Sequence, residues 1–352
     1  MSNFETLNCG EWSEVYVFLK TLEVGKLQGG DHRLDLIDNE FCTIINVNKK
    51  QKQTNNNLEY YIKDNNIEVL CDGIFQKVFP KKILGNITEC LFNQIKNNSN
   101  RTFDIPEVQQ FLNSLCNPKT KASSYEKKDI ILSIKEPITK KIQTYGFSVK
   151  SNLCKANSTL LNASKATNFV YVVKDNIADK NLKAKKLLQQ INNITYEKID
   201  STIFDNNLQM IDTQFPKIIS EMLLYYYQGK ATSLEKLIQL IQNHNPLNLD
   251  NTNIYRIKVG DFLLAIALGM MPNTKWNRLY DADGGMLVVR EDGEIVSFYI
   301  FKQQLLEELK EYLIINSYFD TPSTTRHCFG RLYQDGNDTK VKLNLQIRLY
   351  PH

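Results

Sequence analysis

Two strand-like runs separated by a short turn constrain the fold more than any other part of this sequence. The stretch "KKDIILSIKEPITKKIQTYGFSVKS" predicts a strand at 129–134, a turn around Pro137 and a second strand at 141–150. A further apolar run, "FVYVV" at 169–173, predicts a buried strand. Helical patterns flank these strands, among them "EWSEVYVFLKTL" and "IPEVQQFLNSLC". We therefore expect an α/β protein in which helices pack on a mixed sheet of the α+β kind.

The composition fits a soluble protein of one large domain or two ordinary ones. The chain has 352 residues, of which 42% are apolar and 23% charged, so it can bury a substantial core without covalent staples. The longest apolar run, Phe262–Met271, is half the length of a membrane span. The N-terminal sequence lacks the basic start and apolar core of a signal peptide. We therefore expect a cytoplasmic protein with no membrane contact. The net charge of +4 is too small to identify a partner by itself.

The spacing of cysteine and histidine argues against the common disulfide and metal frameworks. No two of the seven cysteines stand at C-x-x-C spacing, and their number is odd. The four histidines form no H-E-x-x-H or similar pair, so a histidine-built metal site is not expected. Reduced thiols are the expectation for Cys9, Cys42, Cys71, Cys90, Cys116, Cys154 and Cys328.

Two further hairpins mark the C-terminal part of the chain. One reads "GMLVVREDGEIVSFYIF" and turns at 292–293; the other reads "FGRLYQDGNDTKVKLNLQIRLY" and turns at 335–336. We expect a core at 1–200 that contains the central hairpin, and a helical and β-hairpin region at 201–352. One integrated domain is the alternative, because no Pro/Gly/Ser-rich linker divides the chain.

The central hairpin brings an acid and a lysine to one end. The position of its turn places Asp129 opposite Phe147 or Ser148, and cross-strand neighbours have Cβ atoms about 5 Å apart. Side chains alternate along a strand, so Ser148 and Lys150 share a face. Asp129 and Lys150 can therefore meet, either as a plain ion pair or as part of a site.

The residues around this hairpin suit a polyanionic partner. Nine lysines and three acids lie between Lys119 and Lys155, and such a surface attracts phosphates. Ser158 stands where it can cap a helix through "TLLNASKATN". Both a helix N-terminus and small hydroxyl or amide side chains are suitable phosphate donors. The candidate contacts to a DNA backbone are Ser151, Ser158, Thr159, Asn162, Ser164, Thr167 and Asn168.

An Asp followed after about twenty residues by x-x-Lys at a strand end is the layout of the PD-(D/E)XK nucleases. Beyond this short motif, the chain resembles the HpaII restriction endonuclease family in segments spread from Gly10 to Tyr350. They read "GEWSEVYVFLKTL…GKL", "TKASSYEKKDI", "GFSVKS…STLLNASKATNFVY", "GGMLVVREDGEIVSFYI", "TPSTTRHCFG" and "KLNLQIRLY". The resemblance implies a PD-(D/E)XK-like restriction endonuclease core with a C-terminal β-hairpin-rich recognition region. It further implies a type II endonuclease that cuts duplex DNA at a short palindrome with Mg²⁺ and leaves 5′-phosphate ends. The specificity of the family's namesake is CCGG.

The motif positions assign roles to three residues of the hairpin. By the resemblance, Asp129 is the metal-binding acid and Lys150 the motif lysine. Ser148 occupies the place usually held by Glu or Asp, so the second carboxylate must come from elsewhere. Some related nucleases take it from a Gly-x-x-x-Glu pattern in the opening helix, which this chain matches at Gly10–Glu14.

Three glutamates are candidates for this second acid. Glu14 is the first, because it completes the pattern, and Glu11 is the second. Both also suit a helix N-terminus on electrostatic grounds alone. Glu107, in the first turn of the helix predicted at "IPEVQQFLNSLC", is the third. With Mg²⁺ held by Asp129 and Glu14, Lys150 would orient the attacking water or help to deprotonate it.

The last strand and a nearby loop supply candidates for sequence recognition. In "KVKLNLQIRLY" apolar and polar residues alternate, so that one face packs on the core and the other is either a solvated face or a DNA-reading face. The loop "TPSTTRHC" adds an arginine and a histidine. Asp281 and Asp283 in "DADGG" could hold a second metal, but a turn is the preferred interpretation. The recognition candidates are Lys342, Asn344, Gln346, Arg348, Arg326 and His327.

The implied partner is double-stranded DNA. A palindromic site calls for two-fold symmetry, met by a homodimer or by a monomer that nicks the strands in turn, and the host would carry a companion DNA methyltransferase. Two other classes stay open at this point. One is a PD-(D/E)XK enzyme of another kind, such as a repair or modification-dependent nuclease. The other is a non-catalytic DNA-binding protein in which Asp129 and Lys150 form only an ion pair.

Overall fold

The computed structural model describes residues 6–50, 56–115, 127–137, 139–155, 157–175, 182 and 184–350. These residues form two compact units, each drawn from more than one stretch of the chain. The first is drawn from Met1–Ser158 and Asp281–Leu309, and the second from Thr159–Tyr280 and Lys310–Tyr350. The division expected at residue 200 therefore falls inside the second unit.

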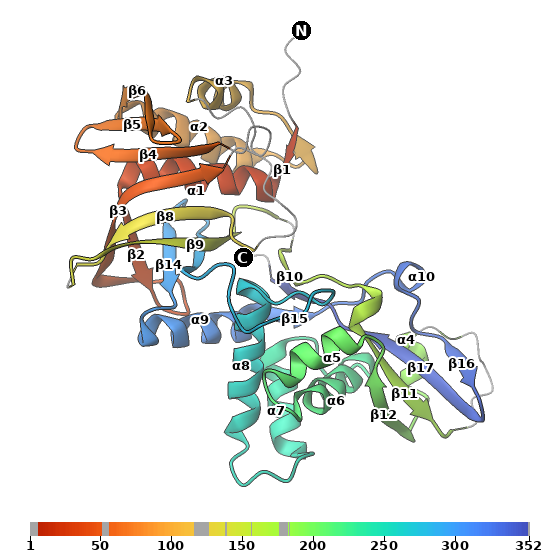
Figure 1. The fold of residues 1–352 in the computed structure, drawn as a ribbon. Helices are drawn as coiled ribbons and strands as arrows, with labels where there is room; N and C mark the ends of the chain where they lie inside the picture. Colours follow the sequence, from red (N-terminus) through yellow and green to blue (C-terminus); the bar gives the residue numbers. More distant parts are fainter. Residues whose placement is uncertain are drawn as a thin grey trace. The chain divides into compact units, whose positions relative to one another are not determined.

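The first unit combines strands and helices in a mixed α/β arrangement (Figure 1). Its strands are β1 (Leu7–Asn8), β2 (Lys26–Gly30), β3 (Leu36–Lys50), β4 (Asn57–Lys63), β5 (Asn66–Cys71), β6 (Ile74–Pro80), β7 (Thr102–Phe103), β8 (Ile130–Lys135), β9 (Ile142–Ser151), β13 (Gly285–Val289) and β14 (Ile295–Tyr299). Its helices are α1 (Cys9–Val24), α2 (Ile83–Asn97) and α3 (Pro106–Ser114), and α9 (Gln303–Asn316) begins in it.

One large sheet organises the first unit. Within the described residues its nine strands follow the order β2-β14-β13-β9-β8-β3-β4-β5-β6. β2 also pairs with β3, so the strands from β2 to β3 form a closed circuit of hydrogen-bonded neighbours. Most neighbours are antiparallel, but β13 runs parallel to β9 and β14 runs parallel to β2. The predicted mixed sheet is therefore confirmed.

Helix α1 packs against α2, β3 and β9, and Figure 1 shows α1 and α2 side by side. A capping box starts the helix: Asn8 Oδ1 accepts from the Glu11 backbone N–H at 3.0 Å, and the Glu11 carboxylate accepts from the Asn8 N–H at 2.8 Å. Gly25 ends it in the left-handed backbone region at φ 74°, which favours glycine. The apolar face expected at Val15, Phe18, Leu19 and Leu22 is buried, but so are Trp12, Ser13, Tyr16, Val17 and Thr21, so that the helix is covered on most sides.

The central hairpin is confirmed, with strand bounds within one residue of the predicted ones. β8 and β9 pair in antiparallel with Ile130 opposite Phe147, so Asp129, just before β8, is in register with Ser148. β9 lies inside the sheet between β8 and β13, which buries both Phe147 and Ser148. The hairpin is thus a fixed part of the core, and its end near Asp129 is held by strands on both sides.

The second unit contains shorter strands and most of the helices. Its strands are β10 (Thr159–Leu161), β11 (Asn168–Val173), β12 (Ile194–Ile199), β15 (Ser317–Phe319), β16 (Leu332–Asp335), β17 (Asp338–Asn344) and β18 (Ile347–Leu349). Its helices are α4 (Ala184–Leu188), α5 (Thr202–Gln209), α6 (Phe215–Tyr227), α7 (Leu234–His244), α8 (Asn253–Leu268) and α10 (Thr324–His327), with one 3₁₀ turn, η1 (Lys165–Thr167).

Two small sheets belong to the second unit. Their strand orders are β12-β11-β17-β16 and β10-β18-β15. Helices α5 to α8 pack on one another in chain order, and the apolar run in α8 is buried among them. Within the described residues, none of the helices is both long and apolar enough to cross a membrane.

The prediction of a helix after Ser158 is wrong. Thr159–Leu161 forms strand β10, which pairs with β18, and its two leucines are buried. Ser164 instead caps η1, because its hydroxyl accepts a backbone N–H two residues on at 3.1 Å. Burial of the leucines in a sheet therefore overrides the cap signal at Ser158.

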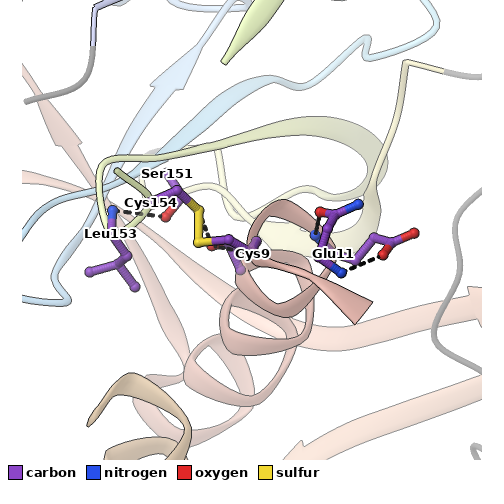
Figure 2. Close-up of a disulfide and its surroundings, with 7 residues drawn as sticks. Cys9, Glu11, Ser151, Leu153 and Cys154 are labelled. Atoms are coloured by element: carbon purple, nitrogen blue, oxygen red, sulfur yellow. Dashed lines mark hydrogen bonds between the residues drawn. A yellow bond between two sulfur atoms is a disulfide. The ribbon is translucent and has the colours of Figure 1, made fainter. Parts of the chain in front are cut away.

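A disulfide joins Cys9, the first residue of α1, to Cys154, in the segment after β9 (Figure 2). The expectation of reduced thiols is therefore wrong for this pair. The two cysteines are 145 residues apart in the sequence, and no local spacing pattern reveals such a pairing. The free thiols among the described residues are Cys42, Cys71, Cys90 and Cys328. Cys116 lies outside the described residues.

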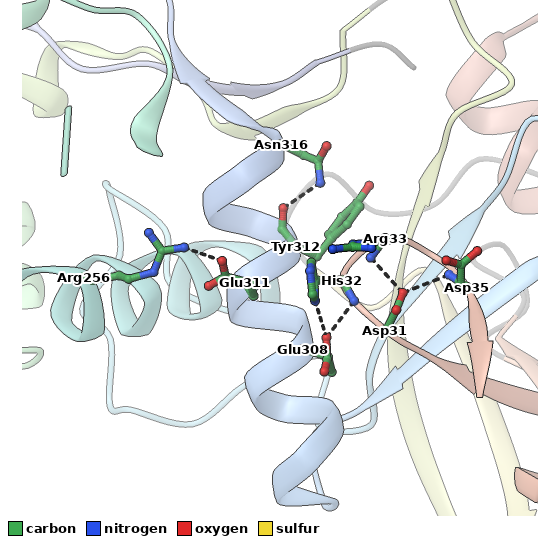
Figure 3. Close-up of polar contacts among 9 residues, drawn as sticks. All are labelled: Asp31, His32, Arg33, Asp35, Arg256, Glu308, Glu311, Tyr312 and Asn316. Atoms are coloured by element: carbon green, nitrogen blue, oxygen red, sulfur yellow. Dashed lines mark hydrogen bonds and ion pairs between the residues drawn. The ribbon is translucent and has the colours of Figure 1, made fainter. Parts of the chain in front are cut away.

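Helix α9 carries polar contacts in both units, because the division between them falls within it. In the first unit, Glu308 accepts the backbone N–H of His32 at 2.8 Å and lies 2.7 Å from its Nδ1 (Figure 3). In the second unit, Glu311 pairs with Arg256 of α8 (Figure 3). Each half of α9 is thus tied to its own unit by a carboxylate.

Candidate active site

Asp129 is fixed across the open end of the β8–β9 hairpin. Its backbone N–H donates to the Phe147 carbonyl at 2.8 Å, which extends the strand pairing by one residue. Its carboxylate Oδ2 accepts from the Val149 N–H at 2.7 Å and from the Ser148 hydroxyl at 3.5 Å. The predicted position of Asp129 beside this end of β9 is thereby confirmed.

Glu14 approaches the same point from α1. The helix packs against β9, and Glu14 lies close enough to Asp129 and Lys150 for their charges to act on its carboxyl group. Burial, and after it the negative charge of Asp129, raise the pKa of Glu14 to about 8, while Lys150 and Lys49 act in the opposite direction. The first candidate for the second acid is therefore a carboxyl group beside Asp129 and Lys150.

Burial dominates the electrostatics of Asp129 as well. It raises the pKa of Asp129, against the lowering effects of Lys150, the Val149 N–H, Lys127 and the Ser148 hydroxyl. Two buried carboxyl groups that lie beside each other repel when both are ionised. They are therefore stabilised either by a bound proton or by a nearby cation. Such groups, within reach of the charge of a lysine, are typical of catalytic sites.

Two further lysines, neither of which was predicted, lie beside these carboxyl groups. Burial lowers the pKa of Lys49 to about 8, opposed by the charge of Glu14. Burial and the charge of Lys150 lower the pKa of Lys127 to about 8, opposed mainly by Asp129. Each acid therefore has a lysine neighbour of its own in addition to Lys150.

The other acidic candidates are engaged elsewhere. The Glu11 carboxylate forms the capping box of α1 (Figure 2), although its charge also contributes to the raised pKa of Glu14. Glu107 is exposed in α3 and accepts from the Cys90 thiol at 3.3 Å. Asp283 accepts the Gly146 N–H at 2.7 Å, within the turn expected at "DADGG". Glu14 is thus the candidate that the fold brings to Asp129.

The side chains at this point offer the ligand chemistry that Mg²⁺ requires. This ion prefers oxygen ligands and keeps several waters, so one or two carboxylates can hold it. Asp129 and Glu14 supply carboxylate oxygens, and Ser148 supplies a hydroxyl. Among the described residues no three His, Cys, Asp or Glu side chains are grouped as a metal site. A cation here would therefore bind through the two carboxylates and through water or phosphate oxygens.

Several predicted DNA contacts come together in the second unit, but inside the protein. Asn344 is fully buried, and its amide donates to the Ser164 carbonyl at 2.7 Å and to Asn168 Oδ1 at 2.6 Å. The Thr167 hydroxyl donates to Asn344 Oδ1 at 3.3 Å, and Asn168 donates to the His327 carbonyl at 3.0 Å. The prediction that Asn344 lies on an open face of the strand is therefore wrong. Its hydrogen-bond network instead joins β11, β17 and α10.

Two other polar residues of the last strand form ion pairs within the protein. Lys342 pairs with Asp200 at 2.6 Å, and Arg348 pairs with Asp320 at 2.8 Å. Gln346 is buried, with 7% of its surface exposed. The strand passes from one sheet to the other just before Gln346, so its polar side chains do not share one open face.

The remaining predicted contacts lie in loops and short elements. Ser151 Oγ accepts the Leu153 N–H at 3.2 Å, near the disulfide (Figure 2). Part of the lysine-rich stretch, at 119–126, lies outside the described residues. Arg326 is exposed in α10, which makes it the recognition candidate most open to solvent. The predicted contacts that are half-buried or exposed are Ser151, Ser158, Thr159, Asn162, Ser164, Arg326, His327, Lys342 and Arg348.

Comparison with known proteins identifies relatives over nearly the whole chain. The family model described as HpaII restriction endonuclease matches residues 8–349. The type II restriction enzyme HpaII of Haemophilus parainfluenzae is 38% identical over 365 residues, which cover 99% of this chain and 99% of that enzyme. No solved structure matches the chain.

These matches define the class of protein: a type II restriction endonuclease, which is a site-specific deoxyribonuclease. The chain belongs to the HpaII restriction endonuclease family. The resemblance based on the quoted segments is confirmed, and a non-catalytic DNA-binding protein is set aside.

Proposed function

We propose that this endonuclease cuts duplex DNA at the palindrome CCGG, with Mg²⁺ as cofactor, through a PD-(D/E)XK-type site formed by Glu14, Asp129 and Lys150. The observation that carries the proposal is the convergence of these three residues, one from α1 and two from the central hairpin. The charges of Asp129 and Lys150 act on the carboxyl group of Glu14. Glu14 nevertheless lies more than a hundred residues before both of them in the sequence.

Each residue has a role in the proposed hydrolysis. Asp129 and Glu14 hold the ion, with the Ser148 hydroxyl beside Asp129; when bound, the ion offsets the charge that develops on the phosphate and on the leaving 3′ oxygen. Lys150 orients the attacking water and helps to remove its proton. The bond from phosphorus to the 3′ oxygen breaks, which leaves 5′-phosphate and 3′-hydroxyl ends.

Recognition is assigned to the C-terminal region at 201–352, and CCGG is the specificity of the family's namesake. Arg326, exposed in α10, suits guanine O6 and N7. A palindrome calls for two-fold symmetry, from a homodimer or from one monomer that nicks each strand in turn. A companion methyltransferase would protect host DNA by modifying cytosine in the same site.

Digestion of one DNA of known sequence with Mg²⁺, followed by mapping of the ends, tests the proposal. All ends should fall within CCGG, with no cleavage in EDTA and none at sites whose cytosines are methylated. Ends at a different sequence would contradict the CCGG assignment. Undiminished cleavage in EDTA would contradict the requirement for a divalent cation.

A further inference from the structure

Gly146 lies in the interior of β9, a position where glycine weakens a strand and often marks a close approach of another segment. Its φ is not positive, so the backbone conformation does not require glycine. The reason is space. A Cβ atom at position 146 would lie 2.9 Å from Lys128 Cβ and 3.1 Å from both Lys128 Cδ and the Asp281 carbonyl oxygen, closer than side chains normally pack. The missing side chain of Gly146 therefore leaves the space in which the Lys128 stem crosses β9.

This contact places Lys128 on one particular face of the sheet. Side chains of alternate residues share a face, so Gly146, Ser148 and Lys150 face the same side of β9. Lys128 Cβ and Cδ both lie against that face at Gly146. The ammonium nitrogen is two bonds beyond Cδ, so it is confined to the same neighbourhood. Lys128 also directly precedes Asp129 in the sequence. The charge of Lys128 is thus held beside the candidate active site.

No acid of the described residues neutralises this charge at close range. None of the ion pairs among those residues includes Lys128, and the residue is half-buried. A lysine in such a setting buries its alkyl stem and keeps its charged end in water. An ammonium group donates three hydrogens and binds phosphate oxygens as a point charge. Lys128 therefore presents an unneutralised positive charge on a stem whose path is fixed, which suits a contact to a phosphate.

We propose that Lys128 is a positioning residue that binds a phosphate of the DNA backbone next to the bond that is cut. Its ammonium group holds the strand, while Asp129, Glu14 and Lys150 act on the scissile phosphate itself. The inference rests on the proposed function, because it requires the scissile phosphate to enter the site at Asp129. A phosphate contact fixes the position of the DNA and carries no sequence information. Lys128 thus contributes to the placement of the strand and not to the choice of site.

The salt dependence of DNA binding measures this contact without any cleavage. Each phosphate that a protein neutralises contributes about 0.9 to the steepness with which log affinity falls against log salt concentration. Lys128→Met should lower the slope by about 0.9, so that its affinity falls about 3-fold less than that of the wild type between about 50 and 200 mM salt. Fluorescence anisotropy of the full-length protein in Ca²⁺, with a duplex that contains the mapped cleavage site, measures both slopes.

Lys128→Arg and Lys135→Met are the matched controls. Lys128→Arg keeps a positive charge that pairs with phosphate, so it should keep the wild-type slope. Lys135 is a lysine of the same hairpin, exposed at the other end of β8, and Lys135→Met should also keep the slope. A merely structural role of Lys128 would lower the affinity without altering the slope. Circular dichroism verifies that each variant is folded. An unchanged slope in Lys128→Met, or an equal fall in Lys135→Met, overturns the inference.

Methylphosphonate substitution, which replaces one charged phosphate by a neutral group, locates the contact on the DNA. The neutral group is placed at one phosphate at a time on either side of the mapped cut. At one of these positions it should weaken binding by the wild type but not by Lys128→Met, in which the charge pair is already lost. Equal losses in both proteins at every position overturn the inference.

The failure of the proposed function gives a different result from the failure of this inference. If Asp129→Ala and Lys150→Ala cleave at the wild-type rate, the proposed function fails at this site and the inference fails with it. Loss of cleavage in those two variants, together with an unchanged salt slope in Lys128→Met, leaves the active site intact and overturns only the role of Lys128.

Discussion

The backbone N–H of Val149 donates a hydrogen bond to Oδ2 of Asp129 across 2.7 Å. A carboxylate held by a main-chain donor of the neighbouring strand takes a position that the sheet determines. Lys150 is the next residue of the same strand, and its charge reaches Asp129. One strand pairing therefore holds the acid and the lysine of the motif together.

Asp129→Ala and Lys150→Ala should each abolish cleavage while specific DNA binding survives. Each change removes a group to which the proposed mechanism gives a role, but the backbone hydrogen bonds of the hairpin remain. Plasmid nicking with Mg²⁺ measures cleavage, and a gel-shift assay with Ca²⁺ measures binding. Lys135→Ala is the control, because Lys135 is an exposed lysine at the other end of β8. Cleavage at the wild-type rate in either active-site variant would sink the assignment.

Glu14 should make the stability of the metal-free protein depend on pH. Burial and Asp129 raise the pKa of Glu14 from 4.5 to about 8, so the folded state binds this proton more tightly than the unfolded state. Below the unfolded value the group is protonated in both states. As the pH rises through about 8, the stabilising effect of that proton is lost. Relative to Glu14→Gln, the wild type should therefore lose free energy of unfolding as the pH rises over this range.

Urea unfolding in EDTA at intervals from pH 5 to pH 8.5 measures the difference between wild type and Glu14→Gln, in which other titrating groups largely cancel. Glu89→Gln is the control, since Glu89 is exposed on α2, and it should follow the wild type. A difference between wild type and Glu14→Gln that stays constant with pH contradicts a raised pKa for Glu14.

Loss of the Cys9–Cys154 disulfide should destabilise the first unit. The bond links the start of α1 to the segment after β9, across 145 residues, and a native cross-link typically stabilises by about 2–4 kcal/mol. Cys154→Ser should lower the free energy of unfolding by about this amount without reductant, and by much less in dithiothreitol. Cys328→Ser, at an exposed free thiol, should match the wild type. Equal stability of Cys154→Ser and wild type without reductant would mean that the bond contributes nothing.

Arg326 and Arg348 should differ in what they do for recognition. Arg326 is exposed in α10, whereas Arg348 pairs with Asp320 at 2.8 Å. Arg326→Ala should remove about 1–3 kcal/mol of discrimination at one base pair, as expected for a contact to guanine. Arg348→Ala should change discrimination little. Affinity for CCGG and for each single-base variant measures both; an equal loss of affinity for all sequences in Arg326→Ala would indicate a phosphate contact instead.

The central hairpin could be predicted because its causes are local. Alternation of side chains and the position of one turn set the register of β8 and β9, and with it the meeting of Asp129 and Ser148. The burial of Val15, Phe18, Leu19 and Leu22 in α1 follows in the same way from helical spacing, whereas the burial of Tyr16 and Val17 does not. The prediction of Glu14 as the second acid depended on the family resemblance. A glutamate near a helix N-terminus is expected on electrostatic grounds even where there is no active site.

Lys49 could not be predicted, because the register of β3 shifts between Ile44 and Asn46. Counting alternate residues from the buried Ile44 would place Asn46 and Asn48 on the core face and Lys49 outside. The irregularity reverses the alternation, so Val47 is buried and Lys49 contacts Phe18 of α1. A bulge of this kind leaves no mark in the composition of the strand.

The disulfide and the burial of Asn344 have a different cause. Both depend on contacts between segments that are distant in the sequence: Cys9 meets Cys154, and Asn344 meets the turn at Ser164. The sequence of the last strand shows that apolar and polar residues alternate, but it does not show which segments cover the polar side. Packing between distant segments therefore determines the contacts of these residues, and local periodicity does not predict them.

The single-turnover cleavage rate of Glu14→Gln, at saturating DNA and Mg²⁺, tests most directly the central claim that α1 supplies the second carboxylate. Glu11→Gln and Glu107→Gln are the comparisons, because Glu11 is engaged in the capping box and Glu107 contacts Cys90. We predict that Glu14→Gln cleaves orders of magnitude more slowly than the wild type, while the other two variants keep most of the rate. A wild-type rate in Glu14→Gln, with the loss appearing in Glu11→Gln or in neither variant, would contradict the claim.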